Sequence, residues 1–183
     1  SHLKNYNSML MLSHFKGHMM GGFGGALKNM SIGIASSKGK IHIHTAGKSL
    51  KFDDAFTAVQ DHFLESMADA DSSVIDFIGK ENMAYINVAN KLSIDCDCDS
   101  NPAEPEMADI GIFASIDPVA LDQACVDACQ KQTPIRNSQL GDNLAKPDWK
   151  HHHDHFMDSN PNVHWKETLE HAEKIGMGSR EYE

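Results

Sequence analysis

The sequence predicts an α/β fold in which a mostly parallel sheet is covered by helices, giving three layers. Short apolar runs at residues 9–15, 84–94 and 109–115 are typical of buried strands. Segments with helical periodicity alternate with these runs, as they do in proteins whose parallel strands are joined by crossover helices. The sequence therefore predicts a single domain over residues 1–183, built around one sheet.

Spacing and capping signals predict the helices. They span residues 26–36, 53–79, 117–132 and 165–176. Asp53 is the expected cap of the second helix, and Gly79 is its expected stop. The third helix begins at Asp117 and Pro118, because an aspartate cap followed by proline at the first helical position is a strong start signal.

Two further segments complete the predicted fold. Residues 40–45, KIHIHT, alternate with period two and are predicted to form a strand on which His42 and His44 project in the same direction. Residues 134–163, which are rich in histidine and contain prolines, are predicted to form a loop.

Residues 1–7 resemble the approach to a strand already under way, which suggests that an amino-terminal part is missing.

Composition limits the class of function. The 183 residues are 40% hydrophobic, and 16 Lys and Arg against 26 Asp and Glu give a net charge of −10, which would repel a nucleic acid backbone. No segment approaches the roughly 20 apolar residues of a membrane span, and the first 30 residues lack a secretion signal. We therefore expect a cytoplasmic protein with a small-molecule substrate or cofactor, and with neither nucleic acid nor membrane as a partner.

The glycine-rich stretch SHFKGHMMGGFGGALKNMSIG, residues 13–33, is the first candidate site. Glycines let a ligand approach backbone amides, and an amide-lined helix start attracts an anion. We interpret Gly22, Gly24 and Gly25 as a cofactor cradle and Lys28 as an anchoring or nucleophilic amine. The alternative is a tight turn with a solvated lysine.

Histidines and cysteines form the second candidate site. Imidazole and thiolate groups bind nickel, zinc or iron, and the candidate ligands are His14, His18, His42, His44, Cys96 and Cys98. The carboxylates of the DCDCD segment, residues 95–99, are expected to raise the thiol pKa and so to disfavour a nucleophile. A simple acidic turn is the alternative for that segment.

The site residues have expected positions in the predicted fold. Because sites in parallel sheets collect beyond the carboxyl ends of the strands, His14, residues 95–99 and residues 115–117 are all expected at one edge. Cys125 and Cys129 lie four residues apart on one helix face, so we expect them to pack in the core.

Ordered segments of the sequence resemble a known family. HFKGHMMGGFGGALKN, SIDCDCD and PEMADIGIFASIDPVALDQAC are similar to successive landmarks of the family catalogued as domain of unknown function 362. The resemblance runs from about residue 8 to the end of the sequence. Many members of that family carry a ferredoxin insert near the place of residues 45–53, but this sequence lacks its cluster motifs, so no iron–sulfur cluster is encoded in that way.

A more distant resemblance concerns the lactate racemases that use a nickel-pincer nucleotide. His18, the GFGG segment at 22–25, Lys28 and His44 fall at spacings similar to those of that family's core motif. The resemblance implies that Lys28 anchors the cofactor, that His44 ligates nickel and that His18 transfers a proton.

The residues and the resemblances together predict a metal- or cofactor-dependent enzyme of redox or proton- and hydride-transfer type, with His18 and Lys28 as catalytic residues. This hypothesis requires His18, Lys28 and His44 to converge on one pocket. The alternative is a non-catalytic metal- or iron–sulfur-associated accessory protein, for example a partner of a separate ferredoxin. It requires Cys96 and Cys98 to meet another thiol or the histidines in a closed site.

Overall fold

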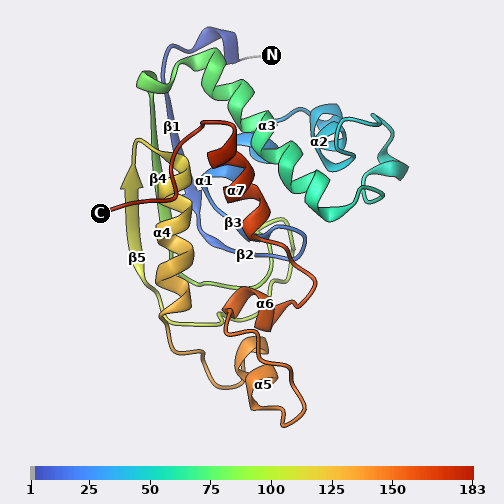
Figure 1. Cartoon of the computed structure of the whole chain (residues 1–183), viewed down its shortest axis with the longest axis vertical. Helices are drawn as coiled ribbons and strands as arrows, with labels where there is room; N and C mark the ends of the chain where they lie inside the picture. The colour runs from blue at the N-terminus through green and yellow to red at the C-terminus, as the bar shows by residue number, and fades with distance from the viewer. Residues whose placement is uncertain (1–2) are drawn as a thin grey trace.

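A small mixed sheet lies along one side of the molecule (Figure 1). The structure is a computed structural model and describes residues 3–183. The strands β1 (Met9–His14), β4 (Met83–Ala89) and β5 (Gly111–Ser115) form the sheet in the order β1-β4-β5. The prediction of an α/β fold is confirmed, but a mostly parallel sheet is not, because β1 and β4 are parallel whereas β4 and β5 are antiparallel.

The direction of β5 corrects the expected position of one set of residues. Gly111 pairs with Ala89 and Ser115 pairs with Tyr85, so β5 ends at the edge opposite to His14. Residues 115–117 therefore do not join His14 at one edge. The expectation was wrong because an apolar run carries no information about strand direction.

Helices cover one face of the sheet in the part of the chain that the structure describes. The helix α4 (Pro118–Gln130) packs on β4 and β5, as Figure 1 shows. Side chains on the opposite face are exposed, including Leu10 at 60%, Leu12 at 62% and Ile112 at 72%. The predicted third layer is therefore not seen among residues 3–183.

The glycine-rich stretch forms a short antiparallel hairpin followed by a helical turn. Its strands are β2 (Lys16–His18) and β3 (Gly22–Gly24), and the turn consists of α1 (Ala26–Lys28) and a π-helical turn η2 (Asn29–Gly33). The hairpin needs glycine at position 22, because φ there is +78° and a Cβ would collide with Trp165. The helix expected from Ala26 is thus present.

The predicted strand at residues 40–45 is wrong, because these residues belong to the helix α2 (Ser37–His44). Ser36 begins α2 by accepting a hydrogen bond from the amide of Gly39 on its Oγ. The alternation of Ile and His over residues 41–44 is too short to distinguish a strand from a helix. In the helix, Ile43 is the one buried residue. Residues two apart on a helix point in different directions, and accordingly His42 is exposed whereas His44 is half-buried.

The long helix α3 (Gln60–Ile78) begins six residues later than predicted, because Val59 rather than Asp53 is its cap. Asp53 instead lies in the short 3₁₀ helix η3 (Phe52–Asp54). The stop at Gly79 is confirmed, with φ of +90°. The start of α4 is also confirmed, since the Asp117 carboxylate accepts the amides of Val119 and Ala120.

Among the described residues, the remaining elements are two short 3₁₀ helices and three α-helices in the second half of the chain. They are η1 (Leu3–Asn5), η4 (Lys80–Asn82), α5 (Gln139–Ala145), α6 (His155–Ser159) and α7 (Lys166–Lys174). The helices α5 and α6 interrupt the segment that was predicted to be a loop, and each has a side-chain cap. The helix α7 fits the prediction for residues 165–176 and packs against α3.

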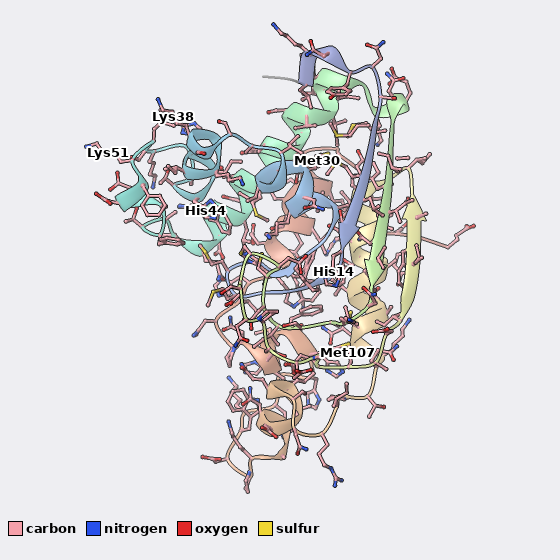
Figure 2. The ribbon with its side chains drawn as sticks, turned by 180° about the vertical axis from the view of Figure 1, so that it is seen from behind. His14, Met30, Lys38, His44, Lys51 and Met107 are labelled. Atoms are coloured by element: carbon pink, nitrogen blue, oxygen red, sulfur yellow. The ribbon has the colours of Figure 1, made fainter. Side chains whose placement is uncertain are left out.

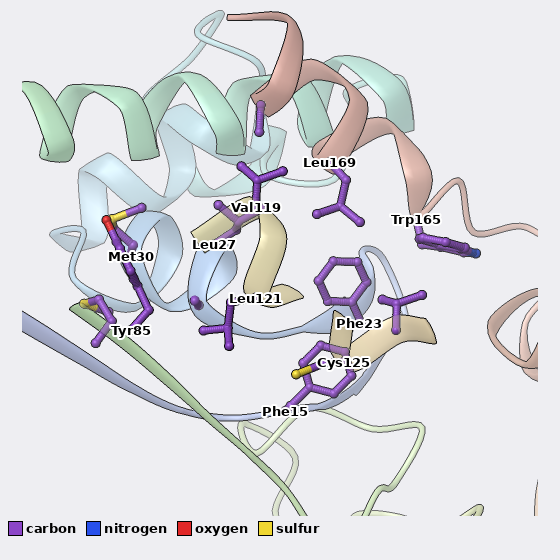
Figure 3. Close-up of a cluster of buried hydrophobic side chains, with 14 of the residues drawn as sticks. Phe15, Phe23, Leu27, Met30, Tyr85, Val119, Leu121, Cys125, Trp165 and Leu169 are labelled. Carbon is purple, nitrogen blue, oxygen red and sulfur yellow. The ribbon is translucent and has the colours of Figure 1, made fainter. Parts of the chain in front are cut away.

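The core lies between the sheet, α1, α4 and α7 (Figure 3). Phe15 stacks on Phe23 with ring centroids 5.4 Å apart, and Phe23 meets Trp165 edge-on. Cys125 is fully buried in this cluster and Cys129 is 2% exposed, as expected from their shared helix face. This packing fixes the hairpin and α1 against α4, and it thereby positions Lys28.

Candidate functional site

A buried carboxylate holds the start of α1. Asp122 on α4 accepts hydrogen bonds from the amides of Ala26 at 2.9 Å and Leu27 at 3.0 Å, and from Asn87 Nδ2 at 2.7 Å. Burial raises the pKa of Asp122, and these hydrogen bonds lower it, leaving it at about 6. The helix start that we expected to bind a cofactor anion is therefore already occupied by the protein's own carboxylate.

Lys28 projects from α1 onto the DCDCD segment. Its Nζ donates a hydrogen bond to Cys96 Sγ at 3.0 Å. Gly24 leaves room for this side chain, because a Cβ at that position would lie 3.1 Å from Lys28 Cδ. In the structure, therefore, Lys28 is not the solvated lysine of the alternative interpretation.

Cys96 is the most strongly perturbed thiol at this site. Burial alone would raise its pKa, but hydrogen bonds from His18, Cys98 and Lys28 outweigh burial and lower the pKa to about 5. The pKa of Cys98 is raised, chiefly by its hydrogen bond to Cys96. At neutral pH the pair therefore consists of a Cys96 thiolate and a Cys98 thiol.

This result corrects the expectation that neighbouring carboxylates raise the pKa of Cys96. The carboxylates on either side bind other groups. Asp97 accepts from Lys16 Nζ and contacts His14, and Asp95 accepts the amide of Ala103. The Cys96 sulfur instead contacts Cys98 within the same segment and Lys28 and His18 from a distant part of the chain, and all three lower its pKa.

His18 lies beside the thiolate in a defined orientation. Its Nδ1 accepts hydrogen bonds from the amides of Met20 at 3.2 Å and Gly21 at 3.0 Å. The ring proton therefore resides on Nε2, which leaves that nitrogen as the donor to Cys96. His18 can accordingly move a proton to or from the sulfur.

His44 stands near His18 and Lys28. Burial lowers the pKa of His44, and the charges of His18 and Lys28 lower it further, against a raising hydrogen bond to Lys40. Its Nδ1 donates to the carbonyl oxygen of Lys40 at 2.7 Å, and its ring stacks on Phe63 at 4.9 Å. The neutral ring thus keeps Nε2 free as an acceptor or a ligand atom.

His14 and His42 lie apart from this group. Figure 2 shows His14 at the end of β1 and His44 on α2, well separated. Both ring nitrogens of His14 are engaged, Nδ1 with Asp97 at 3.0 Å and Nε2 with the carbonyl oxygen of Asn90 at 2.7 Å. His14 therefore has no free nitrogen for a metal, and with Lys16 it fixes Asp97 in the turn that carries both cysteines.

The predicted metal ligands converge only in part. His18, Cys96 and Cys98 meet at Lys28, with His44 nearby, whereas His14 binds Asp97 and His42 is exposed on α2. Across residues 3–183, no set of three or more His, Cys, Asp or Glu side chains is grouped closely enough to hold a metal ion. Metal binding therefore stays a prediction.

A cavity of about 490 Å³ adjoins this centre. His18 lines it and also contacts Cys96, so this one imidazole connects the thiolate with the cavity. Lys16, Gly17 and Gly22 of the hairpin form part of the wall, and α5 and α6 close the other side. A small molecule in the cavity would therefore lie against His18.

The comparison with protein families agrees with the sequence resemblance. A family model described as Domain of unknown function (DUF362) matches residues 1–127, which is more than half of the chain. The chain belongs to the DUF362 family. No curated protein and no solved structure matches this DUF362 chain. The similarity to the lactate racemases is not confirmed, so the roles it implies for His18, Lys28 and His44 stay predictions.

Three residues that shape the site of this DUF362 chain were not found from the sequence. Asp122 lay within a predicted helix, and nothing in the pattern indicated that it holds the start of α1. Asp97 stands out in the sequence only as part of an acidic segment, and Glu106, a buried carboxylate that lines the cavity, carries no signal in the sequence at all. The structure also has no helix within residues 3–183 that is both long and apolar enough to cross a membrane.

Proposed function

We propose that this DUF362 chain is an enzyme that acts on a small molecule by redox or proton-transfer chemistry, with Cys96, Lys28 and His18 as its reactive groups. The observation that supports the proposal is the contact of Lys28 Nζ with Cys96 Sγ at 3.0 Å. A lysine ammonium beside a cysteine stabilises the thiolate, which is the form that attacks electrophiles and binds metals.

The three groups have complementary chemical roles. The Cys96 thiolate offers an electron pair, while the ammonium of Lys28 stabilises negative charge next to it. His18 presents Nε2–H to the sulfur and lines the cavity, so it lies where a general acid or base must lie. This arrangement favours proton or electron transfer at the end of the cavity near His18.

The same residues suit a metal ion or a metal-bearing cofactor by the kind of donor that they offer. Thiolate sulfur and imidazole nitrogen are donors that zinc, nickel and iron prefer, and Cys96, Cys98 and His44 supply both kinds. Within residues 3–183 these side chains are not grouped closely enough to hold an ion by themselves, so a metal would enter as part of a cofactor. A cofactor held there would supply hydride or electron transfer that protein side chains cannot supply alone. Lys28 is the amine closest to these donors and is the group we propose as its anchor.

Elemental analysis combined with intact mass tests this proposal. The native protein is compared with Cys96→Ser and Lys28→Met, and Lys38→Met on the exposed surface of α2 is the matched control. We expect stoichiometric metal or an added mass in the native protein and in the control, and its loss in Cys96→Ser and Lys28→Met. Metal or added mass that is absent throughout, or that persists in Cys96→Ser, would contradict the cofactor and its site.

The exposed position of Cys98 favours a second candidate, a non-catalytic protein that holds a metal or cluster, for example for a ferredoxin-type partner. An exposed thiol beside a thiolate can accept a metal without a substrate. The two candidates differ in whether the bound metal keeps an open coordination position. Cobalt-substituted protein titrated with cyanide would change its visible spectrum if a position is open, as in an enzyme, and would not change if the site is closed.

A further inference from the structure

The cavity beside His18 has a mainly apolar wall. Its volume of about 490 Å³ lies in the range of pockets that hold small organic ligands. The large apolar residues that line it are Phe15, Leu92, Ile94, Met107, Trp149 and Phe156. Figure 2 labels Met107, which lies below His14 in that view. A ligand that fills this cavity must therefore present an apolar body.

Glu106 is a buried carboxylate in this wall and is only 3% exposed. One carboxylate oxygen, Oε2, accepts the amide of Leu140. The other, Oε1, is buried without a hydrogen-bond partner among the residues that the structure describes. A buried carboxylate oxygen without a donor is costly, so a hydrogen-bond donor on a ligand would stabilise it.

The charged groups of the cavity favour a cationic ligand. Asp95 adds a second carboxylate to the wall, close enough for its charge to raise the pKa of Glu106, although burial is the larger cause. Lys16 is the one lysine or arginine among the described residues that line the cavity, and its Nζ is bound to Asp97. An anionic ligand would thus meet two carboxylates and, among the described residues, no lysine or arginine free to pair with it.

From this geometry we propose that the cavity binds a small organic amine carried on an apolar body, whose ammonium group is received by Glu106 and Asp95. The proposal names the class of small molecule for the site described above, and its role as substrate rests on the proposed function. Binding of the amine to the cavity does not depend on that function.

Calorimetric titration with two matched probes tests the ligand class. The first probe, 2-phenylethylamine, is a cation on an aromatic body, and the second, 3-phenylpropionate, has a similar size and the opposite charge. We expect the amine to bind about tenfold tighter or more, as a hydrogen bond to a charged group predicts. Tighter binding of the carboxylate, or no binding of either probe, would overturn the proposal.

Two variants locate the preference. Glu106→Gln keeps an oxygen for the amide of Leu140 and removes the charge, and Asp95→Asn removes the other charge. Each is expected to weaken amine binding about tenfold or more, whereas Asp76→Asn on the exposed surface of α3 leaves it unchanged. If Glu106→Gln does not fold, as judged by circular dichroism, the amine affinity of Asp95→Asn alone tests the assignment. An amine affinity unchanged in the folded variants would overturn the assignment.

Failure of this inference can be told apart from failure of the proposed function. Metal content and added mass are measured on the same protein samples without any amine. Loss of amine binding with an intact Cys96 centre would overturn only the ligand class. Amine binding without a cofactor or a reactive thiolate would leave the cavity as a binding site and overturn the proposed function.

Discussion

The chain has two pairs of cysteines, and the structure makes them chemical opposites. Cys96 and Cys98 lie in the turn after β4, where Lys28 and His18 reach Cys96 and lower its pKa to about 5. Cys125 and Cys129 lie on α4 inside the core, where burial raises the pKa of both thiols, that of Cys129 to about 12. The difference shows that the groups in contact with the sulfur, which for Cys96 are His18, Cys98 and Lys28, decide which thiol is reactive.

Alkylation of the native protein should give the largest contrast between the two pairs. Iodoacetamide at neutral pH is expected to label the Cys96 and Cys98 pair, because Cys96 is ionised and Cys98 is exposed. Cys125 should react about a thousandfold more slowly, since it requires an opening of the core. Cys129 lines the cavity but is only 2% exposed, and it should also react slowly because its pKa is raised to about 12. Mass spectrometry of digested samples checks this, with labelling in urea as the control. Equal labelling of all four cysteines would contradict the difference in reactivity between the two pairs.

Asp122→Ala should disturb both regions at once. The substitution leaves the amides of Ala26 and Leu27 and the Asn87 amide group without their acceptor, so we expect a loss of about 3 kcal/mol or more in the free energy of unfolding. Urea denaturation measures the loss. Asp76→Ala on the exposed surface of α3 is the control and should change stability by less than about 0.5 kcal/mol. A loss for Asp122→Ala as small as that of the control would contradict its role in holding α1.

The pH dependence of stability should distinguish Cys96 from Cys129. The pKa of Cys96 in the folded protein, about 5, lies below its ordinary value of 9.0, so ionisation stabilises the fold increasingly as pH rises between these values. This contribution is lost as pH falls through about 5. The gap in unfolding free energy between native protein and Cys96→Ala should therefore widen with pH, by at most about 1.4 kcal/mol per unit. The gap for Cys129→Ala should stay constant up to pH 9, and a constant gap for Cys96→Ala would count against an ionised thiol.

Among these substitutions, Cys98→Ser should have the smallest effect on the pKa of Cys96. A serine at position 98 can still donate a hydrogen bond to the thiolate, so the pKa of Cys96 should rise by less than about one unit in Cys98→Ser. Cys98→Ala removes the donor and should raise the pKa of Cys96 more. The alkylation rate of Cys96 as a function of pH measures its pKa in both variants. A larger rise of that pKa in Cys98→Ser than in Cys98→Ala would contradict the role of the side chain at position 98 as a hydrogen-bond donor.

Local signals in the sequence predicted those parts of the fold that depend on local interactions. Asp117 and Pro118 begin α4, and Gly79 ends α3, because capping and left-handed backbone are properties of a few adjacent residues. The four-residue alternation in KIHIHT was too short to distinguish a strand from the helix α2. The direction of β5 depends on pairing with β4, which no residue within β5 indicates.

The candidate site was predictable in its residue types and not in its contacts. His18, Lys28 and Cys96 were identified because each belongs to a dense local segment of reactive groups. The charge state of Cys96 could not be predicted, since the ammonium that contacts it comes from 68 residues away. Asp122 and Glu106 act through burial and distant amides, and such effects leave no local pattern in a single sequence.

The central claim is that hydrogen bonds from His18, from Cys98 and from the ammonium of Lys28 keep Cys96 ionised, and titration of the thiolate ultraviolet absorbance tests it most directly. The signal of Cys96 is taken as the difference between native protein and Cys96→Ala, and the same difference is measured in Lys28→Met and Lys38→Met backgrounds. The account predicts a midpoint near pH 5 in the native protein and in Lys38→Met, and a clearly higher midpoint in Lys28→Met. A native midpoint near the ordinary value of 9.0, or one unchanged by Lys28→Met, would contradict it.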